Sequence, residues 1–474
     1  MEKTTSAEEF KPSLGLIDAT MVVAGSMIGS GIFIVSADIT RNVGSTGWLI
    51  LVWLLTGFMT IAAAVTYGEL SAMFPKAGGQ YVYLKEAYNP LVGFLYGWSF
   101  FSVIQTGTIA AVGVAFSKFT AYLIPQVSED ITLFSIGRVP ISPAQLLSMA
   151  TIILLTYINT KGVRNGKIIQ TFFTSIKIVS LFGLIICGLV LFKGDVWHNN
   201  WKDAWNLHRL NKDGTTESYL TFAAFGAIAS AMVGSIFSSV AWENVTFIAG
   251  EIKNPKRNVG MSLFLGTLLV TVIYVAANIM YVAVLPLTDI ANAGKDRVAV
   301  AATQAIFGNM GTYAIAIMIM IATFGCNNGL VLSGARVYYT MAKDGLFFRK
   351  AGHLNRFAVP EFGLWIQCVV ASLLCLSGKY GDLLDMVSFV VVLFYVLTIV
   401  GVFILRKKRP DIPRPYKAFG YPVLPIIYIL MGLAFCLLLI LFKPSYVIYG
   451  IIIVAIGVPI YYLAIQKKGK NAEL

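Results

Sequence analysis

The sequence AGSMIGSGIF, residues 24–33, lies in the middle of the first long apolar segment of the chain. Glycine and serine form helices poorly, yet a helix that crosses lipid must satisfy every backbone N–H and C=O within itself. If the helix unwinds at this stretch, its freed amides and carbonyls must face a protein-lined cavity. Amides at a helix N-terminus attract a carboxylate, and unwound carbonyls attract an ammonium group or a metal cation. One broken helix would therefore hold both ends of a zwitterion, whereas the alternative is close packing of small residues between helices.

The overall composition is that of an integral membrane protein. Hydrophobic residues make up 57% of the 474 residues and charged residues 12%, and the mean hydropathy is +0.76. A soluble protein carries about a quarter charged residues, and a β-barrel would show short alternating segments in place of these long apolar runs. Because a helical span needs about 20 mostly apolar residues, the sequence predicts about 12 transmembrane helices, near residues 14–38, 47–73, 91–124, 144–160, 167–193, 220–250, 260–286, 309–341, 360–378, 382–405, 421–442 and 446–466.

The spans are predicted to form one domain. No low-complexity linker divides residues 1–474, so the fold class is a single all-α polytopic membrane domain. The connections are short except at two places. Residues 74–90 should form a turn followed by an interfacial or re-entrant piece, and residues 194–219 form a polar, tryptophan-containing outer segment with a structural role.

Basic residues predict the orientation of the chain. Most of the 36 lysines and arginines fall in segments on the side of the N-terminus. The positive-inside rule then places both termini in the cytoplasm. We expect a multi-pass protein of the cell inner (plasma) membrane. This bias accounts for the net charge of +13, so we expect no nucleic-acid partner. Residues 1–13 are polar, and we expect no cleavable signal peptide.

Nothing in the sequence indicates catalysis. The five cysteines all fall inside predicted spans, and the three histidines are scattered singly in connecting segments. Metal-ligand clusters, nucleophile triads and phosphate-binding loops are missing from the sequence. We therefore expect no enzymatic activity, no metal site and no cofactor.

A second apolar segment is also interrupted. The sequence GSIFSSVAWEN, residues 234–244, places small and polar residues and then a carboxylate in the middle of a span. The two interrupted segments lie within the first and sixth spans. Two interrupted spans at corresponding positions are the sequence pattern of a transporter site between inverted repeats.

Lys177 is the most informative charged residue within a span. It lies close to ten residues from the inner end of its span, about 15 Å deep, which is too far for the ammonium group to reach the surface comfortably. A charge at that depth costs a few kcal/mol, so the side chain must face the protein. We interpret Lys177 as a fixed cation that replaces a metal ion, or as a proton carrier. The structural alternative is a buried hydrogen-bond anchor.

Other polar residues inside the spans are ambiguous. Glu243 and Asn244 would serve in a pocket or gate, or form a structural pair. Gln105, Thr106 and Thr108 would line a substrate side chain, although hydroxyls in such helices often bond back to their own backbone.

Four further polar residues are less informative. Glu69 and Lys118 lie nearer span ends and are interpreted as snorkelling or interface residues. Asn327 and Asn328 either cap a kink or face the cavity.

Several motifs together carry a family resemblance. The chain resembles the amino acid–polyamine–organocation superfamily, and within it bacterial members of the L-amino acid transporter branch, over nearly its whole length. The motifs are GSGIF at 29–33, YGEL at 67–70, PKAGG at 75–79, GEIKNPKRN at 250–258, FGCNNG at 324–329 and RPYK at 414–417.

The resemblance implies a LeuT-type fold with a 5+5 inverted repeat and discontinuous helices 1 and 6. Residues 1–193 and 220–406 would be the two repeats, and residues 421–466 would form peripheral helices 11 and 12. Lys177 corresponds to a family lysine that stands where sodium-coupled relatives bind an ion, and Phe237 to an aromatic lid over the substrate. The implied site consists of Ser26, Ser30 and Gly31 for the substrate carboxylate, the carbonyls of Met27, Phe237, Ser238 and Val240 for its amino group, and Gln105, Thr106, Phe237, Ser239, Glu243 and Asn244 for the side-chain pocket and gate.

The chain departs from the family pattern at three places. Val240-Ala241 replaces a usual glycine pair, which narrows the space around the substrate side chain. Glu243 replaces a more typical neutral amide and would favour a cationic substrate or a proton role. Residues 125–143 contain no cysteine, so we expect no disulfide-linked heavy subunit.

The resemblance predicts a function. The chain is expected to be a sodium-independent secondary transporter of L-amino acids that works by alternating access and exchanges neutral, small-to-medium substrates. The alternative is a proton-coupled importer, including one for a cationic substrate. Outside this class, an ion channel would give conductance in place of saturable, stereospecific flux. The expected partners are the amino acid and the lipid bilayer, and no oligomeric state is predicted.

Overall fold

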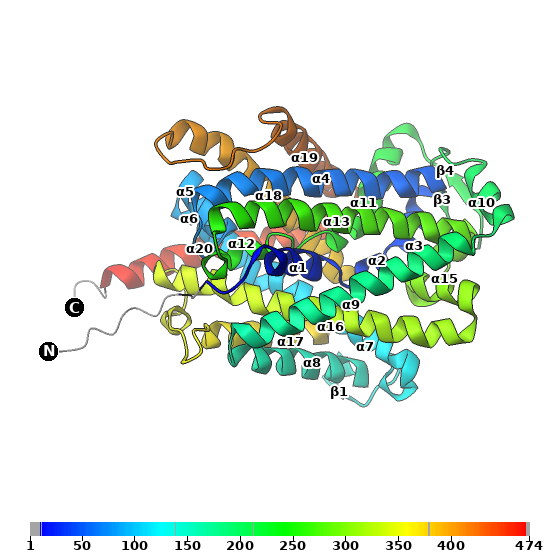
Figure 1. Cartoon of the computed structure of the whole chain (residues 1–474), viewed down its shortest axis with the longest axis horizontal. Coiled ribbons are helices and arrows are strands. Elements are labelled where there is room, and N and C mark those ends of the chain that lie inside the picture. The colour runs from blue at the N-terminus through cyan, green and yellow to red at the C-terminus, as the bar shows by residue number, and fades with distance from the viewer. Residues whose placement is uncertain (1–9, 11, 138, 212, 378–379, 471–474) are drawn as a thin grey trace.

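The computed structural model describes residues 10, 12–137, 139–211, 213–377 and 380–470. The prediction that both termini are cytoplasmic concerns residues 1–9 and 471–474, which lie outside the described residues. The chain enters and leaves the described part at the same end of the helical bundle, on the left of Figure 1.

Long apolar helices form the bundle. In the described part of the chain, 10 helices are long and apolar enough to cross a membrane. The two remaining predicted spans correspond to α8 (Pro143–Thr160) and α17 (Glu361–Ser377). The predicted all-α polytopic class is therefore confirmed. The other long helices are α4 (Thr46–Met73), α6 (Pro90–Ser99) continued by the π-helical η1 (Phe100–Ile104) and α7 (Gln105–Leu123), α9 (Val163–Val190), α13 (Pro255–Val284), α16 (Asn309–Lys343), α18 (Tyr380–Lys408), α19 (Val423–Phe442) and α20 (Pro444–Lys470).

Helix starts follow from local sequence. Ser142 and Gln145 form a reciprocal capping box at the start of α8, which satisfies two amides that would otherwise lack partners. Asn89 caps α6 through the amide of Val92, and proline stands at the first position of α6 and α13, where its missing N–H removes no helical hydrogen bond.

The first and sixth spans are both broken, as predicted. Helix α1 (Leu16–Met27) ends before α2 (Gly31–Ile34), and α3 (Ser36–Val43) continues to the outer end. Five residues separate the end of α11 (Thr221–Ser238) from α12 (Asn244–Phe247), which leads into η3 (Ala249–Glu251). Ala241 within the second break has a φ of +68°, a left-handed conformation that strains any residue except glycine.

The outer end, opposite the described chain ends, holds two hairpins and short helices (Figure 1). Asn200 of α10 (Gly194–Trp201) donates to the carbonyls of Val282 and Leu285, 2.8 Å each, while its own carbonyl accepts from Thr46 at 2.8 Å. This segment therefore fastens the outer ends of α4 and α13. The hairpins are β1 (Phe134–Ile136) with β2 (Val139–Ile141) and β3 (His208–Leu210) with β4 (Thr216–Ser218).

The expectation of short connections missed one outer segment. Between α13 and α16 the chain forms α14 (Leu287–Ala291), η4 (Gly294–Asp296) and α15 (Val298–Phe307). These helices are too short to span a membrane, and periodicity over five to ten residues gives little signal.

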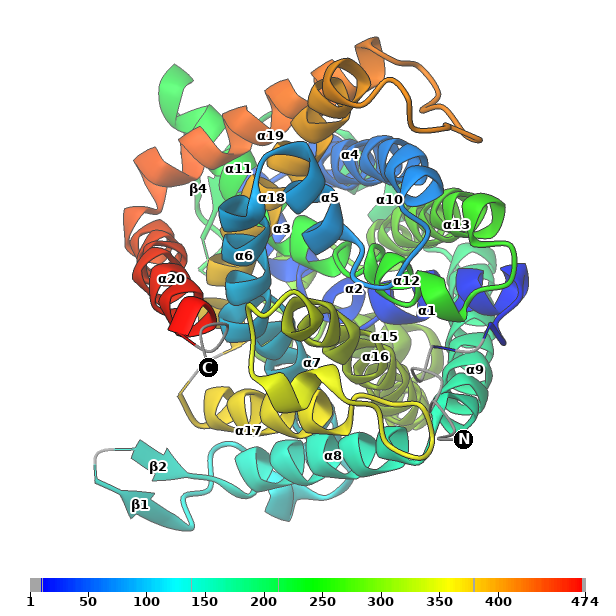
Figure 2. The ribbon, with the colours of Figure 1, turned by 90° about the vertical axis from the view of Figure 1, so that its left-hand side faces the viewer.

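The inner end is tightly packed, and Figure 2 looks onto it. Residues 74–90 contain the short helix α5 (Gln80–Ala87) after a turn, in agreement with the predicted turn followed by a short segment. Ser13 and Leu14 donate backbone hydrogen bonds to the carbonyl of Glu251, at 2.8 and 3.0 Å. The carboxylate of Glu251 pairs with Arg336 of α16 at 2.9 Å, and both side chains are buried.

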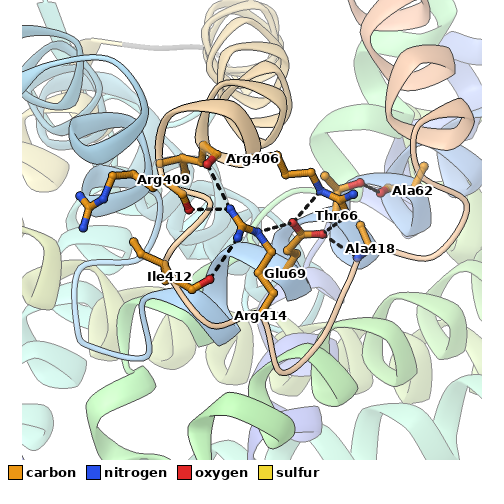
Figure 3. Close-up of polar contacts among 9 residues, drawn as sticks. Ala62, Thr66, Glu69, Arg406, Arg409, Ile412, Arg414 and Ala418 are labelled. Carbon is orange, nitrogen blue, oxygen red and sulfur yellow. Dashed lines mark hydrogen bonds and ion pairs between the residues drawn. The ribbon is translucent and has the colours of Figure 1, made fainter.

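Glu69 does not snorkel. Its carboxylate is fully buried at the inner end of α4 and accepts two hydrogen bonds from Arg406 of α18, at 2.9 and 2.6 Å (Figure 3). The amide of Ala418 donates to it at 2.8 Å, and Arg414 lies 3.5 Å away. We call Glu69, Arg406, Arg414 and Ala418 the inner ionic cluster. The cluster joins α4, α18 and the connection to α19. Of the two predicted roles for Glu69, snorkelling or a place in a helix interface, the structure therefore shows the interface.

The inner halves of α4 and α13 also touch. A Cβ added at Gly260 would lie 3.4 Å from the Cα of Gly68, and one added at Gly68 would meet the ring of Tyr416 at 2.8 Å. The two helices are thus in backbone contact near the inner end, as they are fastened by Asn200 at the outer end.

Candidate functional site

The break between α1 and α2 presents backbone carbonyls to a buried lysine. The amide of Gly29 donates to Met27, two residues back, so the carbonyl of Gly25 loses its helical partner. The Lys177 ammonium of α9 donates to the carbonyls of Gly25 and Ile28, at 2.5 and 2.8 Å, and its side chain has no exposed surface. The last carbonyls of a helix carry partial negative charge. A fixed cation therefore occupies the carbonyl-rich end of α1.

A tyrosine connects the two breaks. The Tyr274 hydroxyl of α13 lies 2.9 Å from the carbonyl oxygen of Met27 and 2.9 Å from that of Ser238. One hydroxyl carries one proton, so it donates to one carbonyl at a time. Tyr281, two turns further along α13, donates to Ile32 at 3.2 Å. Sequence reasoning missed Tyr274 because a tyrosine in an apolar helix is ordinary; its only signal was a polar group at mid-span.

The glycines of the first break also allow close packing. A Cβ at Gly31 would collide with the side chain of Ser238, and one at Gly25 would collide with Gln170 and Thr174. At Gly29 it would lie 3.0 Å from the Cys326 sulfur. Unwinding of the helix and close packing of small residues are the two alternative interpretations of residues 24–33, and the structure shows both.

The predicted carboxylate and amino-group residues gather around the two breaks. Ser26, Ser30 and Gly31 are buried in or beside the first break. The Ser26 hydroxyl has no hydrogen-bond partner among the described residues, while its carbonyl accepts from the Cys326 thiol at 3.0 Å. Met27 and Ser238 meet at Tyr274, and Phe237, Ser239 and Val240 are buried at the second break.

Three residues predicted to line the pocket make their hydrogen bonds elsewhere. Gln105 donates to the carbonyl of Leu330 in α16 at 2.6 Å. Thr106 bonds back to Phe101 in its own helix at 2.9 Å, and Thr108 does the same to Ile104 at 2.6 Å. The π-helical turn η1 precedes these residues and accounts for the five-residue spacing of the Thr106 bond.

Glu243 and Asn244 are buried beside aromatic rings. The Oε2 atom of Glu243 and both polar side-chain atoms of Asn244 lack a hydrogen-bond partner in the described part of the chain. Trp242 packs against Tyr67 and Tyr395, with ring centroids 4.7 and 5.1 Å apart. A cavity of about 20 Å³ beside Trp242 and Ser239 has room for roughly one water molecule.

Asn328 belongs to a buried polar chain at the inner side of the first break. It accepts from Asn159 of α8 at 2.9 Å and donates to Gln170 of α9 at 3.2 Å. Asn327 is buried, and its side-chain amide has no partner among the residues described. Asn328 therefore links α8, α9 and α16, which the sequence did not indicate.

A large cavity lies on the outer side of the breaks. Its volume is about 650 Å³, and Ile34, Val35, Val233 and Gly234 line its deep end. The Ser238 hydroxyl donates to the carbonyl of Gly234 at 2.7 Å, so this end is one helical turn from the second break. The inner end is packed by Glu251, Arg336 and the segment around Leu14. The structure is therefore open toward the outer end.

Two helices broken at mid-span, with a cavity on one side and packed helices on the other, define a polytopic membrane transporter. The chain belongs to the amino acid permease family, whose model matches residues 14–465. It is a membrane transporter and not an enzyme.

Curated relatives agree with this family. The chain is 31% identical over 464 residues to the large neutral amino acids transporter small subunit 2 of Homo sapiens, which covers 97% of this chain and 82% of the relative. It is 29% identical over 479 residues to the b(0,+)-type amino acid transporter 1 of Mus musculus, covering 98% and 92%. It is 28% identical over 463 residues to the Asc-type amino acid transporter 1 of Mus musculus, covering 97% and 82%.

Proposed function

We propose that this protein is a sodium-independent secondary transporter that exchanges neutral, small-to-medium L-amino acids across the inner (plasma) membrane by alternating access. One observation carries the proposal: the Lys177 ammonium donates to the carbonyls of Gly25 and Ile28 in the unwound segment. The ammonium group of this lysine, which is part of the protein, occupies the place where a mobile cation would otherwise bind these carbonyls. Because this cation stays in place through the cycle, no sodium ion has to bind or leave.

The substrate would bind across the two breaks. The amides of Ser30 and Gly31, with the Ser26 hydroxyl, would hold its carboxylate. The carbonyls of Met27, Phe237, Ser238 and Val240 would hold its ammonium group. Tyr274 already reaches two of these carbonyls, but a carbonyl oxygen has two lone pairs and accepts a second donor.

The geometry favours a small side chain. Gly31 lies so close to Ser238 that one added carbon would collide. Val240 and Ala241 add bulk at the second break, where both are buried. Phe237, Ser239, Glu243 and Asn244 would close the pocket around the side chain, together with Gln105 and Thr106.

The remaining expectations are part of the same proposal. Residues 1–193 and 220–406 would be the inverted repeats, with 421–466 peripheral, both termini cytoplasmic and the breaks at the repeat interface. Exchange requires that the empty carrier change sides less readily than the loaded one.

One relative is named a small subunit. Because residues 125–143 of this chain lack cysteine, it would function without a disulfide-linked heavy subunit.

Flux in proteoliposomes tests the proposal. Uptake of labelled L-alanine or L-serine should require unlabelled amino acid inside the vesicles and should not change when sodium is replaced by potassium. Full uptake into empty vesicles that follows an imposed proton gradient would contradict exchange. That result would support the second candidate, a proton-coupled importer, which Glu243 favours because its buried Oε2 atom has no hydrogen-bond partner among the described residues. Labelled L-lysine in the same assay tests a cationic substrate.

The Lys177→Ala variant tests the role of the fixed cation. Removing the ammonium leaves two buried carbonyls without their partner, which costs about 1–3 kcal/mol for each unsatisfied group. We expect exchange to fall at least tenfold while the amount of folded protein in the membrane changes much less. Lys202→Ala, at the exposed end of α10, is the matched control and should exchange normally. Normal exchange by Lys177→Ala would remove the lysine from the mechanism.

A further inference from the structure

Exposed basic residues gather at the inner end, where α13 begins. Lys253, Lys256 and Arg257 lie in the first turn of this helix or just before it, and all three are exposed. Within the residues that the structure describes, no hydrogen bond or ion pair reaches either ammonium group or the guanidinium of Arg257. Three unpaired cations within five residues create a local positive potential that attracts an anion.

The neighbouring carboxylates do not neutralise these charges. Glu251, two residues before Lys253, pairs with Arg336 at 2.9 Å. Glu69, on the adjacent helix α4, is held by the inner ionic cluster. Both carboxylates are buried, so they are committed to contacts inside the protein.

The turn that carries the basic residues is fixed by its own hydrogen bonds. The side-chain amide of Asn258 donates to the carbonyl of Lys253 at 2.5 Å. The backbone amide of Lys253 donates to Leu14 at 2.8 Å, and that of Arg257 to Asn254 at 3.0 Å. The basic side chains therefore project from a fixed backbone, and the N-terminus of this 30-residue helix adds partial positive charge.

A fourth basic residue comes from the connection between α18 and α19. A Cβ added at Gly68 would lie 2.8 Å from the ring of Tyr416 and 3.5 Å from the Cα of Gly260. Tyr416 thus lies at the junction of α4 and α13, about one turn of α13 from Arg257, and the exposed Lys417 follows it. Figure 2 shows this connection beside the inner end of α4. We call Lys253, Lys256, Arg257 and Lys417 the basic corner.

An exposed apolar stripe continues from Arg257 along α13. Its members are 38 to 51% exposed and are Met261, Phe264, Leu265, Leu268 and Val272. Their spacing places them on the same face of the helix as Arg257. At 1.5 Å per residue the stripe is about 16 Å long, and one leaflet contributes about 15 Å of the hydrocarbon core. The stripe therefore has the length of one acyl chain.

We propose that the basic corner and the apolar stripe together bind one anionic phospholipid of the inner leaflet, with its phosphate on Arg257 and the lysines and an acyl chain along α13. The planar guanidinium of arginine matches two phosphate oxygens. Clusters of lysine and arginine beside the inner end of a membrane helix attract anionic headgroups. A free phosphate would use the charges and leave the stripe unused, whereas a phospholipid uses both. The site goes beyond the proposed function and does not depend on the transported substrate.

Native mass spectrometry of the purified full-length protein in a neutral detergent tests the site. The wild type should retain one dioleoyl phosphatidylglycerol in preference to dioleoyl phosphatidylcholine. Each basic residue near an anionic lipid contributes about fivefold in affinity, so Lys256→Gln combined with Arg257→Gln should weaken phosphatidylglycerol binding about 25-fold. The single variant Arg257→Gln should weaken it about fivefold. Binding of phosphatidylcholine should not change in either variant.

The matched control removes the same charge elsewhere at the inner end. Arg349→Gln combined with Lys350→Gln changes two exposed residues of η5 (Arg349–Gly352) and should bind phosphatidylglycerol like the wild type. Both double variants should melt like the wild type without added lipid, because the changed side chains are exposed. An equal loss of affinity in the control would show a general effect of inner charge and overturn the proposal.

Competition identifies the part of the lipid that is recognised. Inorganic phosphate and glycerol 3-phosphate, which lack acyl chains, should displace phosphatidylglycerol poorly. Displacement by either at the concentration at which phosphatidylglycerol itself competes would show a simple anion site and overturn the lipid assignment. Unchanged phosphatidylglycerol binding by the variants of Lys256 and Arg257 would overturn it as well. These measurements contain no amino acid, so their outcome is separate from that of the exchange assay.

Discussion

At the scale of single residues, the site depends on side chains that replace lost backbone hydrogen bonds. Lys177 satisfies two carbonyls of the first break, and Tyr274 serves one carbonyl in each break. The depth of Lys177 could be predicted from the sequence because a lone charge inside an apolar span has few explanations. Its partners could not, because they lie 149 and 152 residues away in the chain. Tyr274 gave no comparable signal, since its phenol ring is compatible with an apolar helix.

Tyr274→Phe tests the connection between the breaks. Removing the hydroxyl deletes a bond that joins Met27 and Ser238 to α13, so the two unwound segments should hold their carbonyls less firmly toward a substrate. We expect exchange to fall about tenfold and the free energy of unfolding to fall by about 1 kcal/mol. Initial rates in proteoliposomes and thermal unfolding in detergent measure the two effects. Tyr449→Phe on the exposed side of α20 should change neither, and equal rates for both variants would refute the role of Tyr274.

At the scale of elements, the breaks are the part of the fold that the sequence predicts best. Clustered glycine and serine weaken a helix locally, so residues 24–33 carry their own signal, and residues 234–244 carry a similar one. The short helices α14 and α15 had no such signal, because they are held by packing against longer elements. Helix α12 has only four residues, and its helical conformation likewise depends on packing against neighbouring elements.

Ala241→Gly tests the strain in the second break. Alanine at a φ of +68° is disfavoured by contact between its Cβ and the backbone, and glycine removes that contact. We expect the variant to gain about 1 kcal/mol in stability and to accept larger substrates, because a buried methyl group is lost beside Val240.

The control lies on the same span. Ala229→Gly, within the regular part of α11, should lower stability by about 1 kcal/mol. Thermal unfolding and competition by L-leucine against L-alanine uptake measure both properties. A less stable Ala241→Gly protein with an unchanged substrate range would contradict the argument.

At the scale of the whole molecule, distant segments are joined by charges at the inner end. The inner ionic cluster brings together the YGEL and RPYK motifs, whose members Glu69 and Arg414 are 3.5 Å apart (Figure 3). Each motif is visible in the sequence, but the contacts of Glu69 are not, because 337 residues separate it from Arg406 and 349 from the Ala418 amide that follows the RPYK motif. Arg406 also stacks on the ring of Tyr421, 3.5 Å from its centroid. This arrangement anchors the connection to α19 on the inner end of α4.

Glu69→Gln tests how much the inner ionic cluster contributes to the stability of the fold. The amide cannot neutralise Arg406 and Arg414, and removing one member of a buried ion pair typically costs about 3–5 kcal/mol. We expect a clear drop in the melting temperature of the purified protein, whereas Glu361→Gln, at the exposed start of α17, should melt like the wild type. An unchanged melting temperature for Glu69→Gln would show that the cluster does not stabilise the fold.

Helices α4 and α13 are fastened near both ends, by Asn200 on one side and by the Gly68–Gly260 contact on the other. The two helices cannot slide or separate without losing these attachments, so we expect α4 and α13 to move as one rigid unit. Tyr274 and Tyr281 project from α13 onto the first span, so any rigid movement of this helix pair should displace the broken segments with it.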